Sequence, residues 1–217
     1  MEARLAILRA CGAASAGAVP LAALEPRMTP LNLRRARQAL PQVGSLLVGL
    51  FPYFTDFSPG NIALYARGRD YHAVLRERLG WAARRMEAER PGLKCAVYVD
   101  ASPYPEILAA ALAGLGVIGQ NGLLIAPRYG SLVFIGTIAV TLSFEGHTQL
   151  RYCQGCGRCI RACPVGALGT ETEPLGMPDG ARCLSSLSQL RGSLTAAQEA
   201  QIAQNGMAWG CDRCQKV

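Results

Sequence analysis

Residues 153–164 read CQGCGRCIRACP, and this stretch decides how the second half of the chain folds. Its four cysteines are separated by two, two and three residues and are followed directly by a proline: Cys153, Cys156, Cys159, Cys163 and Pro164. This spacing is the ligand run of a bacterial-type iron–sulfur cluster, in which three thiolates converge on one cubane and the fourth ligates a neighbouring cluster. A zinc ion takes only four ligands in total, so we favour an iron–sulfur site over zinc.

A cluster that is ligated by Cys163 needs three further thiolates. Downstream of the run the sequence offers Cys183, Cys211 and Cys214. We therefore predict two 4Fe–4S clusters, the second held by Cys163 with these three residues, and the first by Cys153, Cys156 and Cys159. The spacing puts the fourth ligand of the first cluster immediately after Val217, so we expect a truncated C-terminus; the alternative is a first cluster with an open iron.

Composition fits a folded protein in a reducing compartment. The chain has 217 residues, of which 50% are hydrophobic and 17% charged, enough for one domain with a small second one. Seven of the nine cysteines fall in the cluster pattern, which argues against a disulfide scaffold and leaves Cys11 and Cys95 as core residues. The net charge of +7 permits an anionic partner such as nucleic acid without requiring one.

Hydrophobic patterning predicts alternating helices and strands in the first two thirds of the chain. We expect helices over residues 3–16, 31–40, 63–89 and 106–113, and strands over residues 45–51, 95–99, 123–125 and 131–142. This order predicts an α/β sandwich around one sheet over residues 1–147, followed by a small double-cluster ferredoxin-like domain over residues 148–217. The apolar runs are shorter than the roughly 20 residues of a membrane span, so we expect a cytoplasmic protein without a membrane partner.

The glycine-rich stretch from Gly114 to Gly122 contains a GxGxxG pattern. In dinucleotide-binding folds this pattern follows a strand and opens a helix, whereas here a predicted helix precedes it and a strand follows. We therefore reject a dinucleotide site. The glycines are better explained by close approach of the backbone to a bulky ligand, or by a tight crossing of two segments.

Asp100 and His72 are the candidate acid–base residues outside the cysteines. Asp100 ends a predicted strand, where α/β folds commonly carry chemistry, and a desolvated carboxyl there can donate a proton; locally, a turn-capping aspartate is the simpler interpretation. His72 is predicted to be structural, bonded to Asp70.

Several segments together resemble the epoxyqueuosine reductase family, whose members use cobalamin and iron–sulfur clusters to modify tRNA. The resemblance covers roughly residues 45–217 and is carried by residues 46–53 (LLVGLFPY), 65–72 (YARGRDYH), 113–121 (AGLGVIGQN), the Asp100 segment and the cluster region. It implies an N-terminal domain that binds cobalamin, with the clusters supplying electrons for removal of the epoxide oxygen of epoxyqueuosine. It also implies that Asp100 is the catalytic acid and that further residues lie near the corrin: Tyr65, Arg67, Asn121, Ser185 and Asp212.

The chain also departs from that family. The helical-repeat region that usually follows the clusters has no counterpart in these residues, and Leu112, Val117 and Gln120 stand where other side chains are usual. The resemblance implies tRNA as a partner, together with an electron donor such as a flavodoxin or a ferredoxin, and these departures count against tRNA more than against the cofactors. The alternatives left open are a corrinoid reductase of another substrate and a two-cluster electron carrier without corrin.

Overall fold

The computed structural model describes all residues except 55, 57, 147–148 and 173–175. Its centre is a four-stranded antiparallel sheet in the order β1-β2-β6-β3. The strands are β1 (Ser15–Pro20), β2 (Ser45–Pro52), β3 (Cys95–Tyr98) and β6 (Val133–Val140). A two-stranded sheet of β4 (Val117–Ile118) and β5 (Leu124–Ile125) stands beside it.

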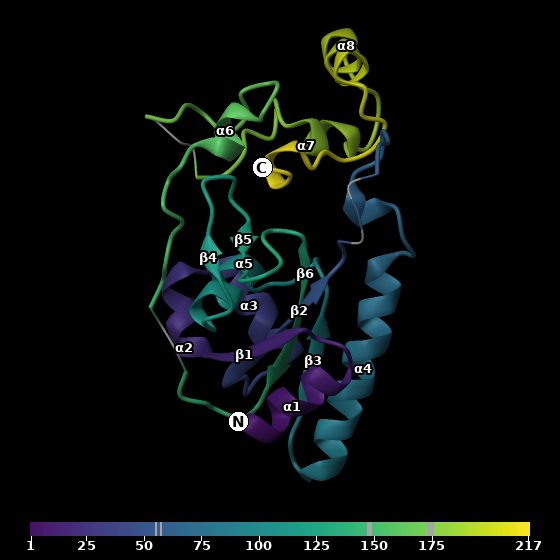
Figure 1. The fold of residues 1–217 in the computed structure, drawn as a ribbon. Helices are drawn as coiled ribbons and strands as arrows, with labels where there is room; N and C mark the ends of the chain where they lie inside the picture. Colours follow the sequence, from purple (N-terminus) through teal and green to yellow (C-terminus); the bar gives the residue numbers. More distant parts are fainter. Residues whose placement is uncertain (55, 57, 147–148, 173–175) are drawn as a thin grey trace.

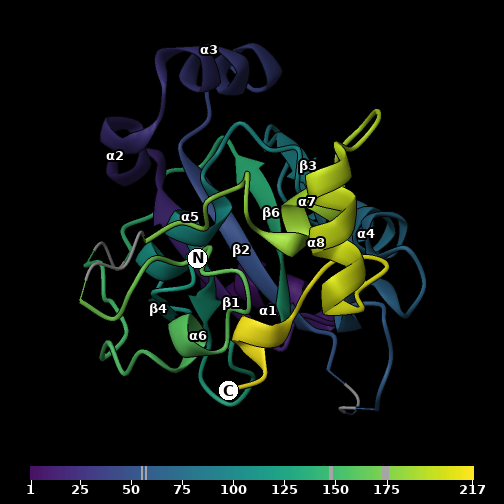
Figure 2. The same ribbon diagram turned by 90° about the horizontal axis from the view of Figure 1, so that it is seen from above.

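Helices cover both faces of the sheet, which makes the three-layer arrangement seen in Figures 1 and 2. One face packs against α1 (Glu2–Ala10) and the long α4 (Tyr71–Glu89). The other packs against α2 (Leu21–Leu24), α3 (Pro30–Ala39) and α5 (Glu106–Leu112). The predicted α/β sandwich is confirmed.

The central strand β2 shows why the sheet is buried on both faces. Leu46, Val48 and Leu50 point into the core under α5, and Leu47 and Phe51 point into the core under α4. A strand covered on both faces reads as a continuous apolar run, as residues 45–51 do.

The long helix α4 lies close to the sheet because two neighbouring strands each have a glycine at the same level beneath it. Gly49 of β2 and Gly136 of β6 are register partners. A Cβ atom on Gly136 would stand 2.7 Å from the Cδ1 atom of Leu79, and one on Gly49 would stand 3.1 Å from the ring of Phe51. Their missing side chains make room for Leu79 and Phe51.

The second part of the chain lies over one end of the sheet (Figure 1). It consists of loops and short helices: α6 (Arg158–Arg161), α7 (Leu184–Ser188), α8 (Ala196–Asn205) and the 3-10 turn η3 (Arg213–Gln215). Two further 3-10 turns, η1 (Glu25–Arg27) and η2 (Leu64–Ala66), belong to the first part. The predicted boundary between residues 147 and 148 lies outside the described residues. Within the described part of the chain, no helix combines the length and apolar character of a membrane span.

Two predicted helices have the wrong bounds. The helix expected over residues 3–16 ends at Ala10, and β1 begins at Ser15, because pairing with β2 overrides the helix preference of an alanine-rich run. The helix expected over residues 63–89 begins only at Tyr71, since the Asp70 side chain caps it by accepting a hydrogen bond from the His72 N–H at 3.0 Å.

Replacing Gly136 by alanine is expected to lower the free energy of unfolding by about 1–3 kcal/mol, because the added methyl group overpacks the contact with Leu79. Gly68→Ala is the matched control, since Gly68 has open space around it. Urea denaturation of both variants measures the difference. Equal midpoints for the two variants would show that the glycine pair does not set the helix-to-sheet spacing.

Candidate functional site

The seven cluster cysteines form two neighbouring groups at the end of the sheet. Four of them line one small cavity of about 40 Å³: Cys163, Cys183, Cys211 and Cys214. Burial, together with the negative charges of the neighbouring thiolates of Cys211, Cys163 and Cys183, raises the pKa of the Cys214 thiol to about 12. Such mutually repelling sulfurs suit a cationic metal centre, because metal coordination deprotonates a thiol outright.

These four residues are the second cysteine group, and the first cysteine group consists of Cys153, Cys156 and Cys159. Burial raises the pKa of Cys159, and the negative charges of the other two thiolates add to this shift. The charge of Cys159 also contributes to the raised pKa of Cys214, so the two groups interact electrostatically. Among the described residues no three His, Cys, Asp or Glu side chains are grouped tightly enough for a single metal ion. A cluster, which brings its own irons and sulfides, spans a wider set of thiols than one ion does.

Backbone and side-chain contacts connect the first cysteine group to the small sheet. The Cys153 N–H donates to the Ile118 carbonyl at 3.0 Å, and the Gly157 N–H donates to the Gln120 side-chain oxygen at 3.3 Å. Gly157 adopts a left-handed conformation at the start of α6, with a φ angle of 71°, which glycine tolerates freely.

A cavity of about 380 Å³ separates the second cysteine group from the sheet. Three of the predicted corrin-contacting residues, Tyr65, Asn121 and Ser185, line it together with the thiols of Cys183, Cys211 and Cys214. Further residues that line this cavity were not predicted as site residues: Tyr53, Tyr71, Ser131, Phe134, Gln189 and Gln215. Since most of them stand on segments far apart in the chain, local patterning carries little signal for them.

Two other predicted cofactor residues, Arg67 and Asp212, bond to the backbone of the chain, although the Nη2 atom of Arg67 is buried without a partner among the described residues. The Arg67 guanidinium donates to the carbonyls of Ile62 and Ser58, both at 2.7 Å, and thereby holds the loop before α4. Asp212 is buried, accepts a hydrogen bond from the Leu64 N–H at 2.8 Å and pairs with Lys216 at 2.9 Å. Both side chains support the walls of the cavity.

Asp100 lines a second cavity of about 390 Å³, which shares Tyr65, Tyr71 and Gln189 with the first. Asp100 follows β3 in a left-handed conformation with a φ angle of 59°, uncommon for a non-glycine residue and typical of functional positions. Trp209 also borders this cavity.

The Asp100 carboxylate is held by two side chains from the start of α4. Its Oδ2 atom accepts a hydrogen bond from the Tyr71 hydroxyl and lies 2.8 Å from the His72 Nε2 atom. The other ring nitrogen of His72, Nδ1, lies 2.8 Å from Asp70, so the predicted Asp70–His72 pair is present. Tyr71 is fixed by stacking on Phe134, with ring centroids 4.0 Å apart. Among the described residues, none is hydrogen-bonded to the other oxygen of Asp100, Oδ1.

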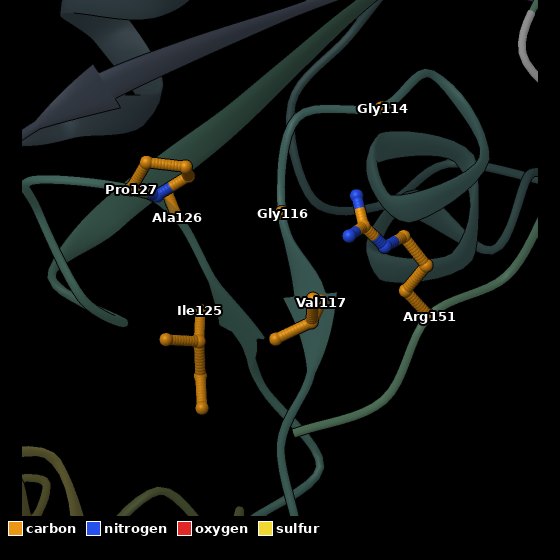
Figure 3. A pocket seen from close by; sticks show the side chains of 7 residues that line it. All are labelled: Gly114, Gly116, Val117, Ile125, Ala126, Pro127 and Arg151. Atoms are coloured by element: carbon orange, nitrogen blue, oxygen red, sulfur yellow. The ribbon is translucent and has the colours of Figure 1, made fainter. Parts of the chain in front are cut away.

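The glycine-rich stretch borders a separate cavity of about 540 Å³ (Figure 3). α5 precedes the stretch and β4 lies within it, opposite to the order of a dinucleotide site. A Cβ atom on Gly116 would stand 2.5 Å from the Ile125 carbonyl oxygen. Gly116 therefore permits the tight crossing of β4 and β5.

Comparisons with known proteins match both parts of the chain. Residues 34–101 match the family model described as epoxyqueuosine reductase QueG, DUF1730, and residues 152–217 match a 4Fe-4S double cluster binding domain. The epoxyqueuosine reductase of Gloeobacter violaceus is 39% identical over 188 residues, which cover 84% of this chain and 58% of that protein. The enzyme of Synechocystis is 36% identical over 194 residues, 83% of this chain and 64% of that protein.

Solved structures give the same result. The epoxyqueuosine reductase from Streptococcus thermophilus superposes with a TM-score of 0.80 at 26% identity, covering all of this chain and 65% of that one. The chain thus spans less than two thirds of the length of these relatives.

The fold and the two matches define the class of protein: an α/β domain joined to a double 4Fe–4S cluster binding domain. More particularly, the chain belongs to the epoxyqueuosine reductase family.

Replacing Cys214 by alanine is expected to abolish assembly of the second cluster and to lower the bound iron by about four per chain. Its side chain lines the same small cavity as the other three thiols of the group. Cys95→Ala is the control, because Cys95 packs against the hydrophobic core away from both groups. Iron and sulfide analysis after anaerobic reconstitution measures the loss, and an unchanged iron content in Cys214→Ala would refute the ligand scheme.

Proposed function

We propose that this chain carries the catalytic core of an epoxyqueuosine reductase, which reduces epoxyqueuosine in tRNA to queuosine with a corrinoid fed by two 4Fe–4S clusters. One observation carries the proposal: a single cavity runs from the thiols of Cys183, Cys211 and Cys214 to Tyr71, which holds Asp100 at the adjoining cavity. An electron source and a proton donor therefore face the same space.

The donor set of the cavity beside the thiols fits cobalamin. Its walls are aromatic, from Tyr53, Tyr65 and Phe134, and its polar groups are neutral amides and hydroxyls, such as those of Asn121 and Ser185. Aromatic and apolar walls suit a planar macrocycle, and amides and hydroxyls suit the amide groups around its edge. A structure described as a B12-dependent reductive dehalogenase shares the fold, with a TM-score of 0.52 at 18% identity.

Bound between the clusters and Asp100, a reduced corrin would supply a strong nucleophile for opening an epoxide. The residues of the chain position this reaction and move the proton. Tyr71 and His72 hold one oxygen of Asp100, Oδ2, at the start of α4. The other oxygen of Asp100 would then protonate the oxygen that leaves the epoxide.

The proposed substrate is a tRNA. The net charge of +7 favours a polyanion, and Arg69 and the aromatic Trp209 border the Asp100 cavity, where an extruded nucleobase would need a cation and a stacking surface. An epoxyqueuosine reductase structure with a modified tRNA-Tyr stem loop shares the fold, with a TM-score of 0.81 at 24% identity.

The two parts of the chain have different roles in the proposed reaction. Residues 1–147 form the cofactor-binding domain, and residues 148–217 form the electron-transfer domain, which takes electrons from a donor such as a flavodoxin or a ferredoxin. Two oxygen-sensitive clusters require a reducing compartment, so the proposed location is the cytoplasm.

The proposal is tested by reconstituting the chain anaerobically with iron, sulfide and cobalamin and incubating it with tRNA that carries epoxyqueuosine and a chemical reductant. Formation of queuosine, with tRNA binding that weakens steeply as salt rises, supports it. Clusters without bound corrin would favour an electron carrier. Bound corrin without tRNA-dependent turnover would favour a reductase of another substrate.

Asp100→Asn is expected to retain both clusters and cobalamin but to lose turnover by about 10²–10⁴-fold, because the amide keeps the shape of the side chain and cannot donate an acidic proton. Glu89→Gln, which alters an exposed carboxylate at the far end of α4, is the control. Single-turnover conversion measures the rate and absorption spectra measure cofactor content. Full turnover by Asp100→Asn would remove this residue as the acid.

A further inference from the structure

The loop that leads into α6 presents the first cysteine group at the surface of the molecule. Cys156 is exposed, and the aromatic side chain of Tyr152, next to Cys153, is 67% exposed. Aromatic residues are enriched where proteins bind one another. A cluster ligand and an aromatic contact residue are therefore accessible on the same loop.

Three arginines surround this loop. Arg151 and Arg158 are exposed, and neither forms an ion pair within the described part of the chain. Arg161 donates to the Cys156 carbonyl at 3.3 Å and pairs with Glu171 at 2.8 Å. Glu171 thus offsets the charge of Arg161, and among the described residues the charges of Arg151 and Arg158 are left unbalanced.

The cavity of about 540 Å³ shown in Figure 3 adjoins the same loop. Its walls are apolar, and Arg151 is the charged residue of its lining. Val117, which also lines it, precedes Ile118. The Ile118 N–H donates to the Arg151 carbonyl, and the Ile118 carbonyl accepts from the Cys153 N–H, both at 3.0 Å. This cavity, which the proposed reaction does not use, therefore lies next to the first cysteine group.

The two cysteine groups face different surroundings. Three members of the second group line the cavity proposed for the corrin, whereas no member of the first group is among the described residues that line it. With a cofactor in that cavity, the second group would be covered on this side. An electron donor that approaches from solvent therefore reaches the first group, through the exposed Cys156.

We propose that the face formed by Arg151, Tyr152, Cys156 and Arg158 docks a flavodoxin, an acidic protein that carries a flavin with an apolar edge. Arg151 and Arg158 attract the carboxylates of the donor, and Tyr152 packs against its surface. The apolar cavity beside Arg151 receives the edge of the flavin, which is the reason for a flavin carrier over an iron–sulfur carrier. The inference rests on the proposed function, which requires an electron donor.

The arginines have a second effect on this encounter. Thiolate-ligated clusters and an acidic donor are both negatively charged, so cations between them lower their repulsion. In the transfer, the anionic flavin hydroquinone loses one electron and keeps its proton, and one ferric ion becomes ferrous. Electron-transfer complexes bury little surface, so charge governs how fast they form.

The first test follows cluster reduction and needs neither corrin nor tRNA. The full chain is reconstituted anaerobically with iron and sulfide and mixed with flavodoxin hydroquinone, and the loss of cluster absorption is timed by stopped flow. Arg151→Gln and Arg158→Gln are each expected to slow reduction about three- to tenfold at low salt and to make it less salt-dependent. Arg34→Gln is the matched control, because α3 lies far from α6 in both views (Figures 1 and 2).

The second test measures the affinity for flavodoxin by titration at low salt. Tyr152→Ala is expected to weaken binding about tenfold, and Tyr152→Phe to retain it, because the ring makes the contact. Val117→Thr, which keeps the shape of the side chain and adds a hydroxyl to the cavity wall, is expected to weaken flavodoxin binding as well. Iron content and the extent of reduction by dithionite, which needs no docking, check that the variants hold intact clusters.

Two results would overturn the inference. Wild-type rates for both Arg151→Gln and Arg158→Gln would mean that the donor docks elsewhere. Arginine-dependent reduction by an acidic ferredoxin, with none by flavodoxin, would mean that the occupant is not a flavin carrier. A wild type whose clusters accept electrons from flavodoxin, and which does not reduce epoxyqueuosine when loaded with cobalamin, would refute the proposed function and leave the docking face supported.

Discussion

The hydrogen bond from the Leu64 N–H to the buried Asp212 carboxylate joins residues 148 positions apart and holds the site together. Asp212 stands between Cys211 and Cys214, and Leu64 begins the turn that carries Tyr65. A buried carboxylate without its partners is strongly destabilising, so this bond fixes one position of the cysteine segment over the sheet. Gln215 reinforces it by donating to the Ser131 carbonyl at 2.8 Å. Through these contacts the thiols and the aromatic residues become walls of one cavity.

The two cavities differ in the chemical character of the residues that line them. The cavity beside the thiols has aromatic walls and neutral polar groups, which would suit a large macrocycle. The cavity beside Asp100 is lined by charged residues, including Arg69 and Asp70, and has Trp209 at its border. Tyr71 lines both cavities and stacks on Phe134, so one fixed side chain lies between the proposed cofactor site and the proposed acid.

Asp100 and Glu106 are six positions apart and have different surroundings. Asp100 is exposed and lines an open cavity, whereas Glu106 is the first residue of α5 and its Oε1 atom is buried. Burial is the main reason that the pKa of Glu106 is raised, and the charge of Asp100 adds to the shift. Asp100 follows Val99 after the end of β3 and adopts a left-handed conformation there.

The sequence by itself determined the cysteine spacing, the order of strands and helices and the segments of the family resemblance, because these signals are local. It also identified Asp100, Tyr65, Asn121 and Ser185 as candidates, through the resemblance. Tertiary structure decided the rest. β1 forms because its backbone pairs with β2. Its alanine- and glycine-rich segment has no strong preference of its own for a strand. The buried state of Glu106, and the use of Arg67 and Asp212 as supports for the loops, depend on neighbours remote in the chain. Burial and electrostatic coupling are properties of the assembled core, which no stretch of sequence carries alone.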